Sequence, residues 1–119
     1  MKYMLLIYAN EAGWSTLTQE QMGQAMAAYG AYTEALTAAG VRIASDRLRN
    51  TNTATSVRIV NGETKVLDGP YAESKEQLGG FYMIEVPDLD TALSWAARCP
   101  GAGHGTVEVR PVWEMPYYA

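Results

Sequence analysis

Apolar residues follow strand and helix periods in the first third of the chain. Residues 3–9 (YMLLIYA) are apolar on both alternating sets, which is typical of a strand covered on both faces. Residues 10–17 are predicted to form a loop. Thr18-Gln19-Glu20-Gln21 then matches a capping box, and Gly40 is suited to end the helix that this box opens. The apolar positions expected to pack this helix are Met22, Ala25, Met26, Tyr29, Tyr32 or Thr33, and Leu36.

The middle of the chain predicts extended structure with one tight turn. A second extended segment begins at residues 41–43. Residues 54–60 and 63–67 flank Asn61-Gly62, which is the strongest short-range signal for a β-hairpin. We therefore expect a hairpin after the second extended segment.

The last third repeats the strand–helix–strand order of the first. Residues 80–86 are again apolar on both alternating sets. Pro87-Asp88 opens a second helix, which Pro100-Gly101 ends. Residues 106–114 are predicted to form the final strand, in which Pro111 requires a sheet edge or a bulge. The core stripe predicted for the second helix is Leu89, Ala92, Leu93 and Ala96.

This order of elements predicts an α+β fold of the ferredoxin-like type, in which two split βαβ units carry an inserted hairpin. Both helices then cover one face of the sheet, while the other face keeps the apolar residues of segments 3–9 and 80–86. A soluble monomer rarely exposes so large an apolar face. We therefore expect a single domain over residues 1–119 that forms a homodimer, in which two sheets meet face to face around a barrel-like interior.

Composition narrows the classes of partner and cofactor. The 119 residues are enough for one domain, and a hydrophobic content of 48% argues against disorder. A net charge of −4, without any run of Lys or Arg, argues against direct binding of nucleic acid. With one cysteine and one histidine, neither a metal site nor a cofactor is expected. The first apolar run is too short for a membrane span or signal peptide, so we expect a cytoplasmic protein.

The most distinctive motif is the turn Asp68-Gly69-Pro70 with the charged residues that follow it. Pro restricts φ and Gly permits a positive φ, so these residues impose a sharp bend between two strands. Such a bend does not need the alternating charges of Glu73, Lys75 and Glu76. Residues 68–81 (DGPYAESKEQLGGF) closely resemble the signature of the YCII-related proteins, also called DGPF-domain proteins, with Tyr71 in place of the eponymous Phe.

The resemblance covers residues 2–114 and includes the closing strand around Arg110. It implies a dimeric α+β barrel, in agreement with the fold predicted from the apolar pattern. It implies no particular reaction, because the family has no established general one. The broader group carries a His–Asp pair proposed as catalytic, but this chain has no histidine in its early helix–strand region. That departure places the catalytic proposal in doubt for this chain.

The loop after the Asp-Gly-Pro turn is the leading candidate for a small-molecule site. Asp68 is the candidate general base, with Glu73 or Glu76 as a second acid–base or orienting group. Tyr71 offers a stacking wall, and Lys75 offers a countercharge. The alternative interpretation is a self-capping turn followed by a solvated loop.

Two further ligand contacts are predicted from the strands. Alternation places Arg110 on one face with Glu108 and Val112, where an inward arginine can clamp a carboxylate or a phosphate. The alternative for Arg110 is an edge-strand charge that discourages aggregation. Tyr8 and the tyrosines of the first helix are either packing residues or hydroxyl groups that line a cavity between sheet and helix.

The remaining residues of chemical interest are not assigned to a functional site. Arg47 and Arg49 are interpreted as surface charges of a strand or loop. A nucleophilic pair of Cys99 and His104 is disfavoured, because no third orienting residue is evident nearby. The tail of residues 115–119 has no evident chemistry, and we expect it to lie across a neighbouring subunit.

Two functions of different classes stay open. The first is a small-molecule site at the loop, with or without acid–base catalysis. The second is a regulatory or sensor module that contacts an alternative sigma factor. The second follows from the resemblance alone, because family members are often encoded beside such factors or fused to them.

Overall fold

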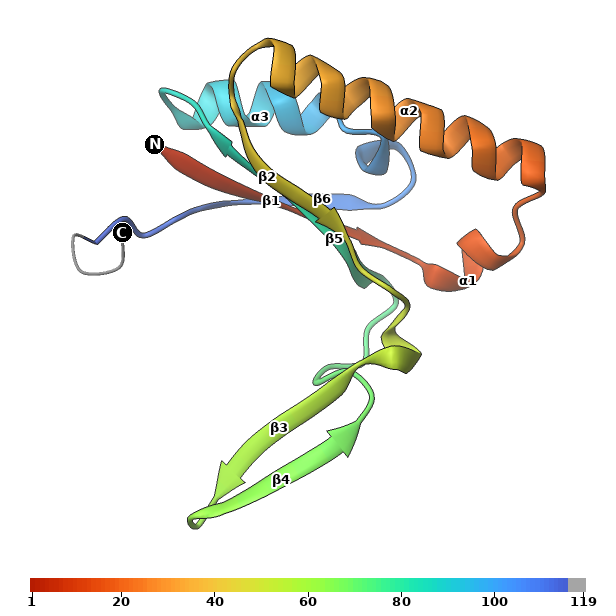
Figure 1. Cartoon of the computed structure of the whole chain (residues 1–119), viewed down its shortest axis with the longest axis vertical. Coiled ribbons are helices and arrows are strands. Elements are labelled where there is room, and N and C mark those ends of the chain that lie inside the picture. The colour runs from red at the N-terminus through yellow and green to blue at the C-terminus, as the bar shows by residue number, and fades with distance from the viewer. Residues whose placement is uncertain (116–119) are drawn as a thin grey trace.

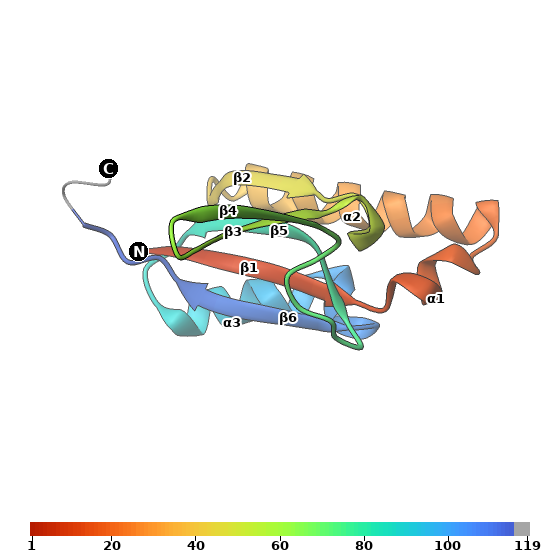
Figure 2. The ribbon, with the colours of Figure 1, turned by 90° about the horizontal axis from the view of Figure 1, so that it is seen from below.

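A four-stranded antiparallel sheet and a separate hairpin make up the β-structure of this α+β protein, whose computed structural model describes residues 1–115 (Figure 1). The sheet has the strand order β2–β5–β1–β6 (Figure 2). Its strands are β1 (Lys2–Ala9), β2 (Arg42–Arg47), β5 (Gln77–Glu85) and β6 (Thr106–Pro111). The hairpin consists of β3 (Thr55–Val60) and β4 (Glu63–Asp68).

The two longer helices lie on the same face of the sheet (Figure 1). They are α2 (Gln19–Ala38) and α3 (Leu89–Arg98). The core between them and the sheet includes Leu5, Leu36 and Ile84, which are fully buried. Tyr32 of α2 packs edge-on against Tyr82 of β5, with ring centroids 5.1 Å apart. One face of the sheet is therefore closed by helices, as predicted.

The opposite face of the sheet has no helix of residues 1–115 packed against it, and the hairpin projects away from it (Figure 1). The strand register places Met4 beside Met83 and Leu6 beside Phe81 on this face, and all four are only half-buried. The helix-facing set of β1, by contrast, is buried. We call the uncovered surface around these four residues the open face.

Local sequence signals for helix starts and turns are confirmed. The Thr18 side chain accepts from the Gln21 amide, and the Gln21 side chain accepts from the Thr18 amide, which completes the predicted capping box. Asn61 and Gly62 have φ angles of 52° and 78°, as a tight hairpin turn of this kind requires. Pro111 ends β6, an edge strand, so the sheet loses no hydrogen bond in its interior.

Two predictions about helices are wrong. Residues 10–17 are not all loop, because Glu11–Ser15 forms a short helix, α1, whose first turn is capped by the Asn10 side chain. In α3, Ala92 and Ala96 are buried, but Leu89 and Leu93 are 48% and 47% exposed. The helix is rotated so that its small residues and Trp95 meet the core, which a periodicity of apolar residues does not distinguish.

The remaining elements connect these layers. Two 3-10 turns, Thr51–Thr53 and Pro100–Gly103, follow β2 and α3.

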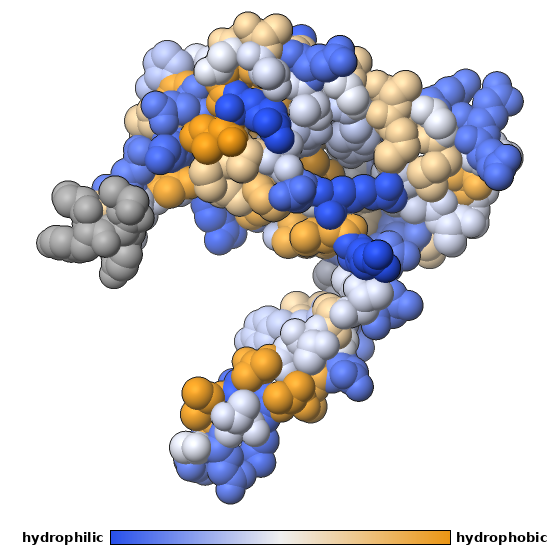
Figure 3. Space-filling view, in the orientation of Figure 1, coloured by the Kyte–Doolittle hydropathy of each residue, from blue (hydrophilic) through white to orange (hydrophobic). Residues whose placement is uncertain are grey.

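Apolar side chains are exposed on the hairpin, which projects away from the sheet (Figure 3). No helix within residues 1–115 is long and apolar enough to cross a membrane. The placement predicted for the chain end concerns residues 116–119, which lie outside the described residues.

Candidate functional site

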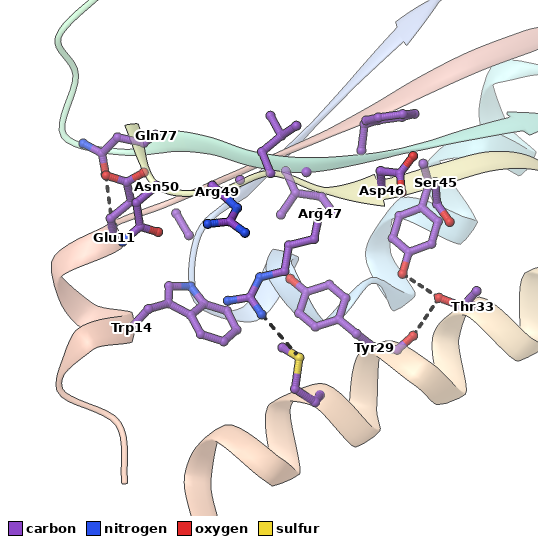
Figure 4. Close-up of a pocket in the computed structure, with 18 residues that line it drawn as sticks. Glu11, Trp14, Tyr29, Thr33, Ser45, Asp46, Arg47, Arg49, Asn50 and Gln77 are labelled. Carbon is purple, nitrogen blue, oxygen red and sulfur yellow. Dashed lines mark hydrogen bonds between the residues drawn. The ribbon is translucent and has the colours of Figure 1, made fainter. Parts of the chain in front are cut away.

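A cleft of about 360 Å³ lies where the ends of β1, β2 and β5 meet α1 and α2 (Figure 4). Its volume falls within the range of small-molecule sites in proteins. The walls combine apolar and aromatic side chains with two arginines and several amide and hydroxyl groups. The lining residues used below are Glu11, Trp14, Met26, Tyr29, Thr33, Arg47, Arg49, Gln77, Gly80 and Tyr82.

Arg47 and the aromatic ring of Trp14 form one wall of the cleft. The guanidinium carbon of Arg47 lies 5.3 Å from the centroid of the Trp14 ring, which is cation–π geometry. Its Nη1 donates to Met26 Sδ at 3.5 Å, a weak hydrogen bond. The side chain of Arg47 is therefore held across the cleft between α1 and α2, and Arg49 lies beside it (Figure 4).

Neither arginine of the cleft is neutralised by a carboxylate of the described chain. The ion pairs within residues 1–115 join Lys65 to Glu63 and Arg110 to Glu108. Arg47 stacks on an uncharged ring, and that contact leaves guanidinium N–H groups for further hydrogen bonds. The wall is therefore suited to a carboxylate or phosphate group of a ligand.

The Glu11 carboxylate has a structural role at the rim. One oxygen accepts from the Thr51 amide at 2.7 Å, and the other accepts from the Thr51 hydroxyl at 2.7 Å. The Glu11 amide donates to Gln77 Oε1 at 3.0 Å. These bonds fix α1 against the start of β5 and the turn at residues 51–53, and so they hold Trp14 in position.

Hydroxyl groups of three residues lie at the helix side of the cleft. The hydroxyls of Thr33 and Tyr82 are 2.7 Å apart. Burial raises the pKa of Tyr29 to about 12, and the nearby Cys99 and Tyr82 add to this while Arg47 opposes it. Burial also raises the pKa of Tyr82. Both phenols therefore stay protonated near neutral pH and act as uncharged hydrogen-bonding groups.

At two positions near the cleft, neighbouring atoms approach so closely that only glycine fits. A Cβ on Gly80 would stand 2.8 Å from the carbonyl oxygen of Asp46, so β2 and β5 approach closely because residue 80 has no side chain. A Cβ on Gly101 would stand 2.8 Å from the Tyr29 hydroxyl and 2.7 Å from Ile7 Cγ2. Gly101 therefore permits Tyr29 to keep its position beside the cleft.

The acid–base residues predicted from the sequence lie outside this cleft. Asp68 ends β4 and is exposed, and Gly69 has a φ of 106°, as the predicted bend requires. Glu73 is also exposed, and Tyr71 is 80% exposed. Their catalytic and stacking roles remain predictions.

The structure brings the other predicted contacts together at a second place. Tyr8, Lys75 and Glu76 line a shallow hollow at the end of β1. The Tyr8 hydroxyl donates to Glu108 Oε1 at 3.5 Å, and Arg110 pairs with the same carboxylate. The Thr106 hydroxyl donates to Glu76 at 2.8 Å. Arg110 thus shares its face with Glu108, as alternation predicted, but it is exposed and already paired.

Sequence reasoning missed most of the cleft. Arg47 and Arg49 are exposed, as expected, but they also line the cleft, whereas they were interpreted as surface charges only. Trp14 was placed in a loop and given no role. A tryptophan in a polar segment, together with an Arg-x-Arg sequence at the end of a strand, is the signal that points to such a site. The Tyr29 hydroxyl does lie beside the cleft, which was one of the two interpretations kept for it.

Other sequence candidates find no site in the described residues. Cys99 is buried, and burial raises the pKa of its thiol, which disfavours the nucleophilic thiolate. His104 is exposed. Within residues 1–115, no three His, Cys, Asp or Glu side chains are grouped so that they could hold a metal ion.

Comparison with known proteins gives a family match over nearly the whole chain. A family model described as "YCII-related domain" matches residues 1–116. An uncharacterized protein of Rhizobium meliloti (strain 1021) is 39% identical over 114 residues, which is 94% of this chain and 92% of that protein.

Proposed function

The chain belongs to the family of proteins with a YCII-related domain, and we propose that it binds a small organic anion in the cleft between α1, α2, β2 and β5. The observation that carries this proposal is Arg47, which lies across a cleft of about 360 Å³ on the face of Trp14 and has no carboxylate partner within residues 1–115.

The chemistry of the walls defines the ligand class. The carboxylate or phosphate of the ligand binds Arg47 and Arg49, because a guanidinium group forms paired hydrogen bonds with such oxygens. An apolar or aromatic body packs against Trp14 and Tyr29, which have the flat apolar surface that this contact requires. The protonated phenol of Tyr29 supplies an uncharged hydrogen bond to a polar substituent.

The proposed assembly is the dimeric α+β barrel expected for the ferredoxin-like fold. The strand order β2–β5–β1–β6, with two helices on one face, supports the ferredoxin-like assignment. The half-buried apolar residues of the open face support a homodimer, because a second copy would remove them from water.

Acid–base catalysis at the loop is a separate part of the proposal. The loop that contains Asp68 and Glu73 leads directly into Gln77 at the rim of the cleft. The variants Asp68→Asn and Glu73→Gln test it with an anionic ligand that the wild type converts to product. Loss of conversion with retained binding of that ligand supports catalysis, and an unchanged rate of conversion shows that neither residue takes part in it.

Binding is tested by isothermal titration calorimetry with benzoate and with uncharged benzyl alcohol as probes. We expect benzoate to bind and benzyl alcohol to bind at least tenfold more weakly, because only benzoate pairs with Arg47. Arg47→Met should weaken benzoate binding about 10- to 100-fold, or about 1.4–2.7 kcal/mol, which is in the range expected for a hydrogen bond to a charged group. The matched control is Arg58→Met on the exposed hairpin, which should leave benzoate affinity unchanged. Equal affinity of Arg47→Met and wild type would contradict the proposal.

A regulatory module that contacts an alternative sigma factor is the second candidate. The exposed apolar side chains of the β3–β4 hairpin favour a function that uses protein contacts. Size-exclusion chromatography of an equimolar mixture with such a factor tests it. Co-elution supports the regulatory function, and separate elution removes it.

A further inference from the structure

The β3–β4 hairpin is an arm that projects from the body of the protein (Figure 1). Its two strands pair only with each other and not with the four-stranded sheet. A hairpin of two strands is at best marginally stable in water unless other structure packs on it. The arm therefore requires a partner surface that residues 1–115 of its own chain do not provide.

The two faces of the arm differ in polarity. The register pairs Val57 with Val66 and Ile59 with Thr64 on one face, and the three apolar side chains are 61%, 60% and 73% exposed. We call this the apolar face of the arm. The other face carries Arg58 and the ion pair between Lys65 and Glu63, with the exposed Val60 and Leu67 near its ends. One face is thus suited to a protein contact and the other to water.

The chain also exposes more surface than a compact globular monomer of the same mass does. Its accessible surface is 8421 Å², whereas a globular monomer of 13.0 kDa has about 6,300 Å². Its radius of gyration is 16.4 Å, against about 13.5 Å for a compact domain of 119 residues. The excess of about 2,100 Å² is comparable to the area that each subunit buries in a large obligate homodimer.

A second copy of the same chain fits both uncovered surfaces at once. The open face of the sheet and the apolar face of the arm belong to one chain, but the strands of the arm do not pair with the sheet. In a two-fold dimer each copy presents both surfaces and covers both surfaces of the other. An unrelated partner would need to match two separate surfaces of this chain at once.

We infer that the β3–β4 hairpin is a clasp that closes on a second copy of this chain and buries Val57, Ile59 and Val66 against it. This inference rests on the homodimer of the proposed function, and it adds the arm to the contact between the open faces.

The first test is sedimentation equilibrium of wild type and of the triple variant Val57→Thr/Ile59→Thr/Val66→Thr. Threonine keeps the branched shape and strand preference but adds hydroxyls to the buried face. We expect the dimer dissociation constant to rise at least tenfold, whereas Arg58→Ser on the other face should change it less than twofold. A triple variant that dimerises like wild type overturns the clasp. The contact between the open faces is then tested separately by Leu6→Glu, which places a charge on that surface. A wild type that stays monomeric at 50 μM overturns both, and the benzoate titration remains independent of either result.

The second test does not depend on how well the triple variant folds. Ile59→Cys and Arg58→Cys place a thiol on opposite faces of the arm, and the native Cys99 is buried. Under dimer conditions, we expect a maleimide reagent to label Ile59→Cys at least tenfold more slowly than Arg58→Cys. Dilution below the dissociation constant should abolish this difference. Equal rates under both conditions overturn the clasp.

Discussion

The substitution Gly101→Ala tests how the core sets the shape of the cleft. Gly101 is buried, and an added Cβ would lie 2.7 Å from Ile7 Cγ2 and 2.8 Å from the Tyr29 hydroxyl. Both separations are far below van der Waals contact. Ile7 lies on β1, one of the two inner strands of the sheet, and cannot move without shifting that strand, whereas the Tyr29 ring can tilt into the cleft.

The expected cost follows from the packing of these two side chains. Adding a methyl group to a well-packed core typically destabilises a protein by about 1–3 kcal/mol. Because the Tyr29 ring yields and Ile7 does not, we expect a loss of about 2 kcal/mol in the free energy of unfolding. For a domain of this length that loss lowers the melting temperature by about 8 °C.

The assay is urea denaturation of Gly101→Ala beside Gly103→Ala, which lies in the same 3-10 turn. A Cβ on Gly103 meets no atom within 4 Å, so this control should lose less than about 0.5 kcal/mol. Adding Tyr29→Phe to Gly101→Ala removes one of the two clashing atoms, and it should restore about 1 kcal/mol in a double-mutant cycle. Equal losses in the two alanine variants, or no recovery with Tyr29→Phe, would refute the packing argument.

Two further predictions concern the hydroxyl groups beside the cleft. Thr33→Val removes the partner of the Tyr82 hydroxyl and should lower the free energy of unfolding by about 1–2 kcal/mol, measured by urea titration. The control Thr37→Val, at an exposed position of the same helix, should change it by less than about 0.5 kcal/mol. Burial raises the pKa of Tyr29 from 10.0 to about 12, so the folded state holds this proton where the unfolded state has lost it. Its contribution to stability is therefore complete below pH 10 and is lost as the pH rises to 12. Melting temperatures between pH 9 and 12 should fall less steeply for Tyr29→Phe than for wild type, and parallel curves would show that Tyr29 contributes nothing.

Local chemistry made much of the secondary structure predictable. The capping box at Thr18 and the Asn61-Gly62 turn each depend on contacts between residues no more than three positions apart. The two apolar sets of β1 likewise indicated a strand between two packed layers, of which residues 1–115 supply one. Such signals are readable from sequence because the atoms that satisfy them are neighbours along the chain.

The elements that sequence reasoning missed depend on distant contacts. Helix α1 has only five residues, too few for a periodic pattern, and Glu11 anchors it to Thr51 forty positions away. The rotation of α3, which buries Ala92 but exposes Leu93, depends on which side chains the sheet presents to it. Periodicity identifies an apolar stripe but not the part of the stripe that reaches the core.

The cleft was decided by tertiary structure alone. Trp14, Tyr29 and Arg47 come from three different elements, and none of them has a local pattern that relates it to the others. The pairing of Arg47 with Gly80 in the β2–β5 register, and the absence of a side chain at Gly80, bring the end of β2 close to β5. The amino-acid sequence by itself determined the strands and the two long helices, the family and the unpaired apolar face. Only the packing of those elements determined which charged and aromatic side chains share one cavity, because that depends on strand register and helix placement across the whole chain.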